Sequence, residues 1–299
     1  MPGLLYEPIP RRRFLRHAAQ AVAALAVTGV GHLPAQTTTD RRVRLALLSD
    51  THLPADPNDR YRGFFPSQNL KSILPQVAAA GPEAVFLNGD AARLTGQRAD
   101  YEALKTRLAP LGQQVPIFIG LGNHDHRERF FSVFTPPPGS AQGVPGKDVL
   151  VVERPDLRFI LLDSLFVTNQ VAGLLGQAQR QWLQEYLARS DARTTILFVH
   201  HTLGESDTDL LDADRLFHLI RPHKKVKAIF YGHSHRYRFD KEGDVHLVNL
   251  PAVGYNFADS EPVGWVEAQF TPAGVELTLH ALGGNRAQDG QRTTLPWSV

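Results

Sequence analysis

The sequence has 299 residues, 42% hydrophobic and 21% charged, which is the composition of an ordinary globular protein with one large domain or two small ones. Its net charge of +2 is unevenly distributed: residues 1–35 carry four arginines against one glutamate, whereas residues 36–299 carry 28 basic against 29 acidic side chains. The near-neutral body gives no reason to expect a nucleic-acid groove. The absence of cysteine excludes disulfides, thiolate metal sites and a cysteine nucleophile.

The first 35 residues are predicted to be an export signal. The arginine-rich stretch RRRFLR at 11–16 is followed by a mild apolar run at 18–30, about 13 residues long and too short to cross a bilayer. The pair Arg11-Arg12, with Phe14-Leu15 after it, resembles a twin-arginine signal. That resemblance implies that the bacterial twin-arginine machinery exports the folded protein to the periplasm or out of the cell. The alternative is an exposed basic helix in a cytosolic protein.

The end of the signal is less clear than its beginning. Cleavage after Ala35 is one possibility, although Leu33 is a poor residue two positions before the cut. The cut could lie elsewhere, or the segment could stay as an anchor, and only then would the protein contact a membrane. We therefore expect a signal at 1–35, a polar linker at 36–42, a domain at 43–283 and a tail at 284–299.

Short apolar runs and helical patterns alternate after the linker. The runs at 43–49, 84–89, 115–120, 159–164, 194–200 and 226–232 are predicted to be buried strands, and the segments at 69–81, 98–112, 176–190 and 210–222 to be helices. The segments at 244–251, 264–271 and 274–282 read as strands with tight turns, which suggests an antiparallel meander that completes a second sheet. The pattern favours an α/β layered domain. The Pro/Gly loop at 135–148 is either a lid or rim, or a connector.

Polar side chains follow five of the predicted strands, at the ends where α/β sheets place their functional residues. They are Asp50 and His52, then Asp90, then Asn123, His124 and Asp125, then His200 and His201, and finally His233 and His235. Each alone has an ordinary structural explanation as a turn residue, a cap or a hydrogen-bonded loop histidine. Their coincidence on five strands argues for a shared site.

Neutral imidazoles and carboxylates suit Zn, Mn, Fe or Ni ions. One catalytic ion needs three or four protein ligands, so seven or eight candidates are enough for two ions. A carboxylate can bridge a pair held about 3.5–4 Å apart, an arrangement that fits the hydrolysis of a phosphoester.

The blocks DTH, NGD, GNHD, VHH and GHSH, in this order, resemble the signature of the calcineurin-like metallophosphoesterases over residues 43–250. The opening DTH, the GNHD block and LLGQAQRQWL before the VHH strand are most similar to the class III cyclic-nucleotide phosphodiesterase branch. The resemblance implies a four-layer αββα sandwich with two mixed sheets flanked by helices. It also implies two divalent or trivalent ions, Mn, Fe or Zn.

Carried over residue by residue, the resemblance implies seven metal ligands: Asp50, His52 and His235 on the first ion, Asn123, His200 and His233 on the second, and Asp90 bridging both. His124 would not bind metal but would act as general acid for the leaving oxygen, or would steady the transition-state charge. Asp125 would orient its neighbours. A metal-bound hydroxide would attack phosphorus in line.

The sequence departs from the family pattern in two places. Thr202 follows His201 where many relatives have proline, so the turn after His200 is expected to differ. The segment AARLTG follows Asp90 where relatives often carry another acidic residue, so a supporting partner is expected to be missing. Arg93 could reach the phosphate or be an exposed loop arginine, and His201 is a candidate support for the ligands. His126 and Arg127 could line the substrate pocket or begin a helix through RERFFSVF.

The leading hypothesis is an exported phosphodiesterase acting on a small phosphoester. Cyclic nucleotides follow from the branch resemblance, although an exported enzyme could equally scavenge external nucleotides or other phosphodiesters. The alternatives are a phosphomonoesterase or nucleotidase with the same site, a non-catalytic binding module on this fold, and a mononuclear hydrolase or lyase. The sequence leaves the substrate, the metals and the oligomeric state open.

Overall fold

The computed structural model describes residues 42–298, so the predicted export signal and most of the linker lie outside the described residues. Within these residues no helix is both long and apolar enough to span a bilayer. The elements, in chain order, are β1 (Val43–Leu48), α2 (Pro66–Ala80), β2 (Ala84–Asn88), α3 (Arg98–Gly112), β3 (Ile117–Gly120), α4 (Arg127–Phe131), β4 (Ala141–Gln142), β5 (Val149–Glu153), β6 (Leu157–Leu162), α5 (Gln177–Arg189), β7 (Thr194–Val199), α6 (Ala213–Ile220), β8 (Val226–Tyr231), β9 (Arg238–Glu242), β10 (Val245–Asn249), β11 (Pro262–Thr271), β12 (Gly274–Gly284) and β13 (Arg292–Pro296).

The strands form two mixed sheets. One has the order β13-β12-β11-β1-β2-β3 and the other β4-β5-β6-β7-β8-β10-β9. β1, β2 and β3 run parallel to one another, and so do β6, β7, β8 and β10. Both sheets therefore have a group of parallel strands whose carboxyl ends can share a site.

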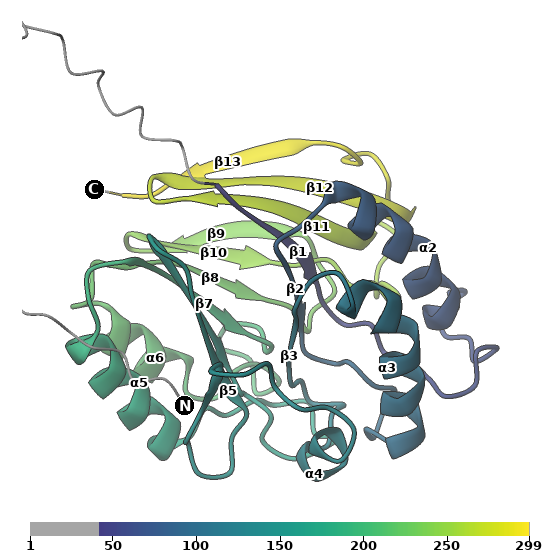
Figure 1. Ribbon diagram of the computed structural model, residues 1–299, viewed down its shortest axis with the longest axis horizontal. Helices are drawn as coiled ribbons and strands as arrows, with labels where there is room; N and C mark the ends of the chain where they lie inside the picture. The colour runs from purple at the N-terminus through teal and green to yellow at the C-terminus, as the bar shows by residue number, and fades with distance from the viewer. Residues whose placement is uncertain (1–41, 299) are drawn as a thin grey trace, which may run out of the picture. The chain divides into compact units, whose positions relative to one another are not determined.

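Figure 1 shows the secondary structure in layers, with helices on the outer faces of the sheets. Three apolar clusters lie between these layers. The cluster between the sheets holds phenylalanines from both, including Phe86, Phe159 and Phe198. A second cluster fills the space between the β1–β3 side and helices α2 and α3, and a third lies between the other sheet and helices α5 and α6. The predicted αββα sandwich is confirmed.

The alternation of side chains along β1 explains how one strand serves two layers. Leu45 and Leu47 point into the core between the sheets, whereas Ala46 and Leu48 point into the core under α2 and α3. Because both faces are covered, the strand is apolar from Leu45 to Leu48 and not alternately polar, and its one polar residue, Arg44 near the start, is exposed.

Local signals in the sequence set the ends of the helices. Pro66 occupies the first turn of α2, where its missing N–H costs nothing, and Gly81 ends the helix in the left-handed region with φ 59°. At α3, Gln97 and Asp100 form a reciprocal capping box. α2 and α3 therefore begin at defined positions, after the loops whose polar residues follow β1 and β2.

The C-terminal third differs from the sequence prediction. β10 pairs in parallel with β8, whereas β11 pairs antiparallel with β1 of the other sheet. The predicted meander is therefore wrong as a single unit, because its strands are divided between two sheets. The predicted tail at 284–299 contains β13, which pairs with β12. The loop at 135–148 includes the short strand β4.

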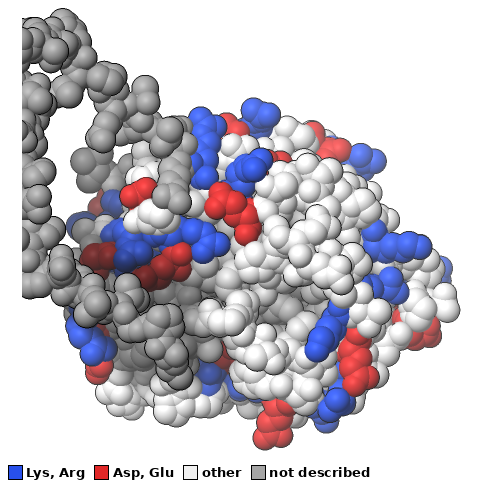
Figure 2. Space-filling view, in the orientation of Figure 1, with Lys and Arg blue, Asp and Glu red and all other residues white. Residues whose placement is uncertain are grey.

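The surface agrees with a near-neutral body. On the face drawn in Figure 2, the lysine and arginine side chains of the described residues are interspersed with aspartate and glutamate, around broad areas without charge. This face has no continuous basic stripe of the kind that tracks a nucleic-acid backbone.

Candidate metal centre

The carboxyl ends of the parallel strands bring the predicted ligands together. Asp50 and His52 follow β1, Asp90 follows β2, and Asn123 follows β3, all in one sheet. His200 follows β7, and His233 and His235 follow β8, in the other sheet. Both sheets therefore contribute to one site, which opens into a cavity of about 430 Å³.

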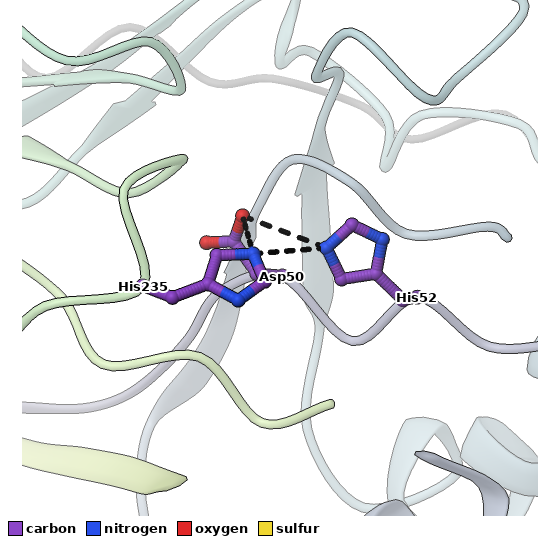
Figure 3. Close-up of side chains that lie close together, drawn as sticks. All are labelled: Asp50, His52 and His235. Atoms are coloured by element: carbon purple, nitrogen blue, oxygen red, sulfur yellow. Dashed lines mark hydrogen bonds and ion pairs between the residues drawn. The ribbon is translucent and has the colours of Figure 1, made fainter. Parts of the chain in front are cut away.

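The first group of ligand atoms comes from Asp50, His52 and His235. Figure 3 shows their side chains converging, with both imidazoles facing the carboxylate. Nε2 of His235 lies 3.3 Å from Oδ1 of Asp50 and 3.1 Å from Nε2 of His52. All three side chains are almost completely buried.

The second group comes from Asp90, His200 and His233. Nε2 of His200 lies 3.3 Å from Oδ2 of Asp90, and Nε2 of His52 lies 3.7 Å from the same oxygen. The Asp90 carboxylate therefore stands between the two groups, the position that a bridging ligand requires.

Backbone carbonyls fix the tautomers of the ligand imidazoles. A carbonyl can only accept, so Nδ1 of His200 donates to Asn88 O at 2.9 Å, and Nδ1 of His235 donates to Tyr255 O at 2.6 Å. In their neutral forms both rings thus have a lone pair on Nε2, which faces the cluster. His233 is reversed: its Nε2 donates to Thr208 O at 3.2 Å, which leaves Nδ1 free to bind metal.

The buried polar atoms fit metal ions. Oδ1 of Asn123 and Nε2 of His200 are buried and have no hydrogen-bond partner among the described residues. A buried acceptor without a partner is costly, and a cation at this place would satisfy Oδ1 of Asn123 and, once His200 has released its proton, Nε2 of His200 as well. With two carboxylates and three further imidazoles beside them, the donor set is of the hard-to-borderline kind that divalent ions prefer.

The two buried carboxylates of the cluster, Asp50 and Asp90, also stabilise positive charge beside them. Burial alone raises the pKa of Asp90, yet the surrounding imidazoles, His200 foremost, hold that pKa well below its usual range. Burial lowers the pKa of His200, but Asp90 and Asp50 together raise it to about 10. Without another cation, the two carboxylates thus retain a proton on His200, and metal binding would release it.

The backbone at the site is held in an uncommon conformation. Asp50, His52, Asp90, His233 and His235 have φ between 43° and 68°, in the left-handed region that residues other than glycine rarely adopt. Such residues cost about 1–3 kcal/mol each and persist only where the surrounding structure enforces them. Here, hydrogen bonds from Asp50 N to Gly89 O and from His52 N to Asp90 O tie the loops together.

Two glycines are required because the ligands pack against their backbone. A Cβ atom on Gly122 would overlap Oδ1 of Asp90 and lie 2.7 Å from Cδ2 of His200. A Cβ atom on Gly232 would overlap Ser49 and the Asp50 carboxylate. The glycine in the block GNHD is thus explained by close approach and not by backbone conformation.

His124 lies beside the cluster and lines the cavity. Its Nδ1 donates to Leu94 O at 2.8 Å, which leaves Nε2 free, and its backbone N–H donates to Oδ1 of Asp90 at 2.8 Å. Its ring centroid is 5.2 Å from that of His52. By distance alone His124 also groups with His52 and Asp90 as a possible metal ligand.

Asp125 supports the loops instead of reaching the cavity. Its carboxylate accepts from the backbone N–H groups of Gly122, Ala91 and Ala92 and from the Tyr101 hydroxyl, at 2.9 to 3.2 Å. Burial, with repulsion from Asp90, raises the pKa of Asp125 to about 6. The Asp125 carboxylate thus binds the backbone of the AARLTG segment, although that segment lacks the acidic residue common in relatives.

His201 and Arg93 lie outside the first layer of the site. Nδ1 of His201 is 2.7 Å from Ser164 Oγ, and its ring centroid is 4.8 Å from that of His233, so it packs behind the ligands. Arg93 forms an ion pair with Asp59 at 3.0 Å, lies over the Tyr61 ring and does not line the cavity.

The residues after the GNHD block begin a helix. His126 stands at the N-terminal boundary of α4, and Nε of Arg127 forms an ion pair with Asp163 at 2.7 Å. The helix interpretation of these two residues is confirmed, and neither is among the residues that line the cavity.

Several cavity residues were not predicted to belong to the site. They include Val171, Thr202, Thr208, Asp209, Arg236 and Phe257. Thr202 directly follows the VHH block and Arg236 the GHSH block, and these positions are the clues that the sequence offers. Phe257 comes from the loop between β10 and β11, and only the three-dimensional structure brings that loop to the site.

Comparison with known proteins gives a consistent result. The calcineurin-like phosphoesterase family model matches residues 43–237. The 3′,5′-cyclic adenosine monophosphate phosphodiesterase CpdA of Pseudomonas aeruginosa is 27% identical over 231 residues, covering 74% of this chain and 79% of the relative. A probable cyclic nucleotide phosphodiesterase of Rhodopseudomonas palustris is 30% identical over 207 residues, covering 65% and 72%.

Solved structures show the same fold. A dimetal phosphatase from Danio rerio superposes with a TM-score of 0.66 at 16% identity, covering 86% of this chain and 99% of the other. A purple acid phosphatase from yellow lupin seeds gives a TM-score of 0.62 at 18% identity, covering 86% and 54%.

Proposed function

The chain belongs to the calcineurin-like phosphoesterase family, and from this premise we propose that it is a phosphodiesterase with a two-metal centre. Membership and the phosphodiesterase relatives make it a metal-dependent phosphoester hydrolase. The observation that carries the finer proposal is the pair of ligand groups with the Asp90 carboxylate between them. One group of three would hold a single ion, whereas two groups joined by a shared carboxylate fit a pair.

Seven side chains would hold the two ions. Asp50, His52 and His235 would bind the first ion, and Asn123, His200 and His233 the second, with Asp90 on both. When bound, the ions supply positive charge that offsets the charge on the phosphoryl oxygens and favours deprotonation of an attacking water.

His124 would serve the leaving group. Because Nδ1 donates to Leu94 O, the ring is oriented, and Nε2 is the nitrogen that would carry the exchangeable proton in the imidazolium form. From the wall of the cavity, Nε2 would hold that proton near the departing oxygen and donate it as the P–O bond breaks. Asp125 acts at a distance, by fixing the loop on which Asn123 and His124 stand.

The substrate class is inferred from the relatives. The named cyclic adenosine monophosphate phosphodiesterases favour a cyclic nucleotide as substrate, with a phosphodiester as the reacting group. Export through the predicted signal at 1–35 is part of the proposal, since a protein exported in the folded state can load its metals first. Outside the cytosol, the same site would act on external nucleotides.

Steady-state hydrolysis tests the proposal. The full chain, supplied with manganese, should cleave bis(p-nitrophenyl) phosphate with a higher kcat/KM than p-nitrophenyl phosphate, and it should open 3′,5′-cyclic nucleotides. A preference for the monoester would make it a phosphatase with the same centre. Cleavage of neither ester, nor of a cyclic nucleotide, by metal-loaded protein would contradict the proposal.

A further inference from the structure

Phe257 is a large, partly open aromatic side chain on the wall of the cavity. Its side chain is 48% exposed and lines the cavity that holds the predicted ligand histidines. An exposed phenylalanine forgoes the stabilisation that burial of a large apolar side chain gives. Aromatic side chains in such a cavity are surfaces on which apolar or aromatic parts of a ligand pack.

The loop that carries Phe257 is held in place. Nε and a terminal nitrogen of Arg62 donate to Asn256 O at 2.8 Å and to Phe257 O at 2.7 Å. The Asn256 side chain donates to Glu261 O at 2.7 Å. The ring is therefore preorganised, which reduces the entropy lost when a ligand packs on it.

Phe257 is also fixed relative to the metal ligands. Its ring stacks on the His235 imidazole, with centroids 4.3 Å apart and planes at 27°. Nδ1 of His235 donates to Tyr255 O in the same loop. The Arg62 guanidinium also lies over the ring, 5.8 Å from its centroid, and the part of the side chain left open lines the cavity. A group packed on that open part of Phe257 would lie next to the phosphate position at the metals.

Arg236 supplies polar recognition at the same place. It follows His235 directly, is exposed and lines the same cavity. Within residues 42–298 its guanidinium has no hydrogen bond or ion pair, unlike Arg62 and Arg93 nearby. Five N–H donors beside an aromatic ring suit a planar group with acceptors on its edge.

We propose that Phe257 and Arg236 form a nucleobase subsite, in which the base packs on the Phe257 ring and its edge accepts hydrogen bonds from Arg236. The proposal rests on the proposed function, since it assumes a nucleotide phosphate at the metal centre. A hydrocarbon chain would pack on the Phe257 ring but would not bond to the Arg236 guanidinium. A sugar phosphate without a base would not pack on the ring. The cavity of about 430 Å³ lies within the usual size of small-ligand sites.

Two phosphate monoesters isolate the contribution of the base. AMP and ribose 5-phosphate share the sugar and the phosphate, and only AMP has a base. Calorimetric titration of the manganese-loaded full chain should show tighter binding of AMP. Equal affinities would overturn the proposal. Turnover is not needed for this measurement, so base discrimination without diester hydrolysis would support the subsite while contradicting the proposed function.

Phe257 variants test the ring itself. Phe257→Ala should weaken AMP binding by about 5- to 150-fold, the range for losing one stacked base, and leave ribose 5-phosphate unchanged. Phe257→Leu keeps an apolar contact with His235 but loses the ring, so it should behave like Phe257→Ala, whereas Phe257→Trp should retain AMP. Equal weakening of both ligands would assign Phe257 to the support of His235 and overturn its role in the subsite.

Matched variants complete the test. Phe131 on α4 is 43% exposed but does not line the cavity, so Phe131→Ala should leave both affinities unchanged. Arg236→Ala should weaken AMP by about 2- to 10-fold, the loss of one or two hydrogen bonds, and spare ribose 5-phosphate. Equal loss for both ligands would place Arg236 on the phosphate and remove it from the subsite.

Discussion

Histidines only a few positions apart in the sequence are given different tasks by their hydrogen-bond partners. His200 and His235 donate from Nδ1 to backbone carbonyls and keep Nε2 for metal, while His233 donates from Nε2 and keeps Nδ1. His124 has the same orientation as His200 but stands on the wall of the cavity. Its free nitrogen is therefore available to the substrate as well as to an ion.

Replacing His124 separates these two roles. In His124→Ala the seven predicted ligands stay in place, so we expect metal content to be unchanged while turnover of the diester falls by roughly 100-fold or more, the usual scale for losing a positioned proton donor. Metal is measured by mass spectrometry and turnover from p-nitrophenolate release.

His218 provides the control, because it is an exposed histidine on α6 away from the cavity. His218→Ala should keep both metal and turnover. Loss of an ion from His124→Ala would show that His124 is a ligand, and normal turnover would remove it from the reaction.

Single residues show what the sequence could and could not reveal about the site. The convergence of the seven proposed ligands at the strand ends was predictable, because parallel strands deliver their carboxyl ends to one edge. The position of the Arg93 side chain was not predictable, because its ion pair with Asp59 depends on how two loops fold together. Phe257 was equally hidden, because it reaches the site from a loop that follows a strand without any ligand.

At the scale of elements, the turns after the strands are as important as the ligands that they carry. Gly122 lies between β3 and Asn123 and packs against Asp90 and His200, so the β3 loop cannot approach them if it gains a side chain. The left-handed residues after β1, β2 and β8 close the other turns. The geometry of the centre is therefore set by the backbone of four loops.

Gly122→Ala tests this dependence. Its Cβ would overlap the Asp90 carboxylate, so we expect loss of at least one ion per chain and a fall in diester turnover of 100-fold or more, because overpacking displaces the shared ligand. Gly143→Ala is the matched control, since a Cβ there meets no atom within 4 Å. Full metal content in Gly122→Ala would contradict the close approach.

The secondary-structure elements differ in how strongly their sequence patterns predict them. The buried parallel strands appear as apolar runs and were predicted, whereas β9 (RFDKE) and β13 (RTTLP) are edge strands with exposed polar residues and carry little pattern. The strand that pairs with β11 could not be predicted from the sequence either. β11 pairs with β1, more than two hundred positions away, and such long-range pairing depends on the packing of the whole domain.

At the scale of the whole molecule, a buried carboxylate links stability to pH. Asp148 precedes β5, is 4% exposed, and its Oδ2 has no hydrogen-bond partner among residues 42–298. Burial, with repulsion from Asp163 that Arg127 only partly offsets, raises the pKa of Asp148 to about 7. Because the folded state binds this proton more tightly than the unfolded state, stability falls as pH rises from about 4 through 7.

Asp148→Asn removes that penalty. Relative to the native chain, the free energy of unfolding of the variant should increase by about 2–3 kcal/mol between pH 5 and pH 8, as measured by urea denaturation at the two values. Asp156→Asn, in an exposed turn, should show no such change. A difference that is equal at both values would show that Asp148 is ionised throughout.

The central claim is that the two sheets together build a centre for two ions, with Asp90 between them. The most direct test is the number of metal ions per chain, counted by mass spectrometry after the protein is supplied with manganese and freed of unbound metal. We predict two ions per chain. One ion or none under these conditions would contradict the two-metal centre.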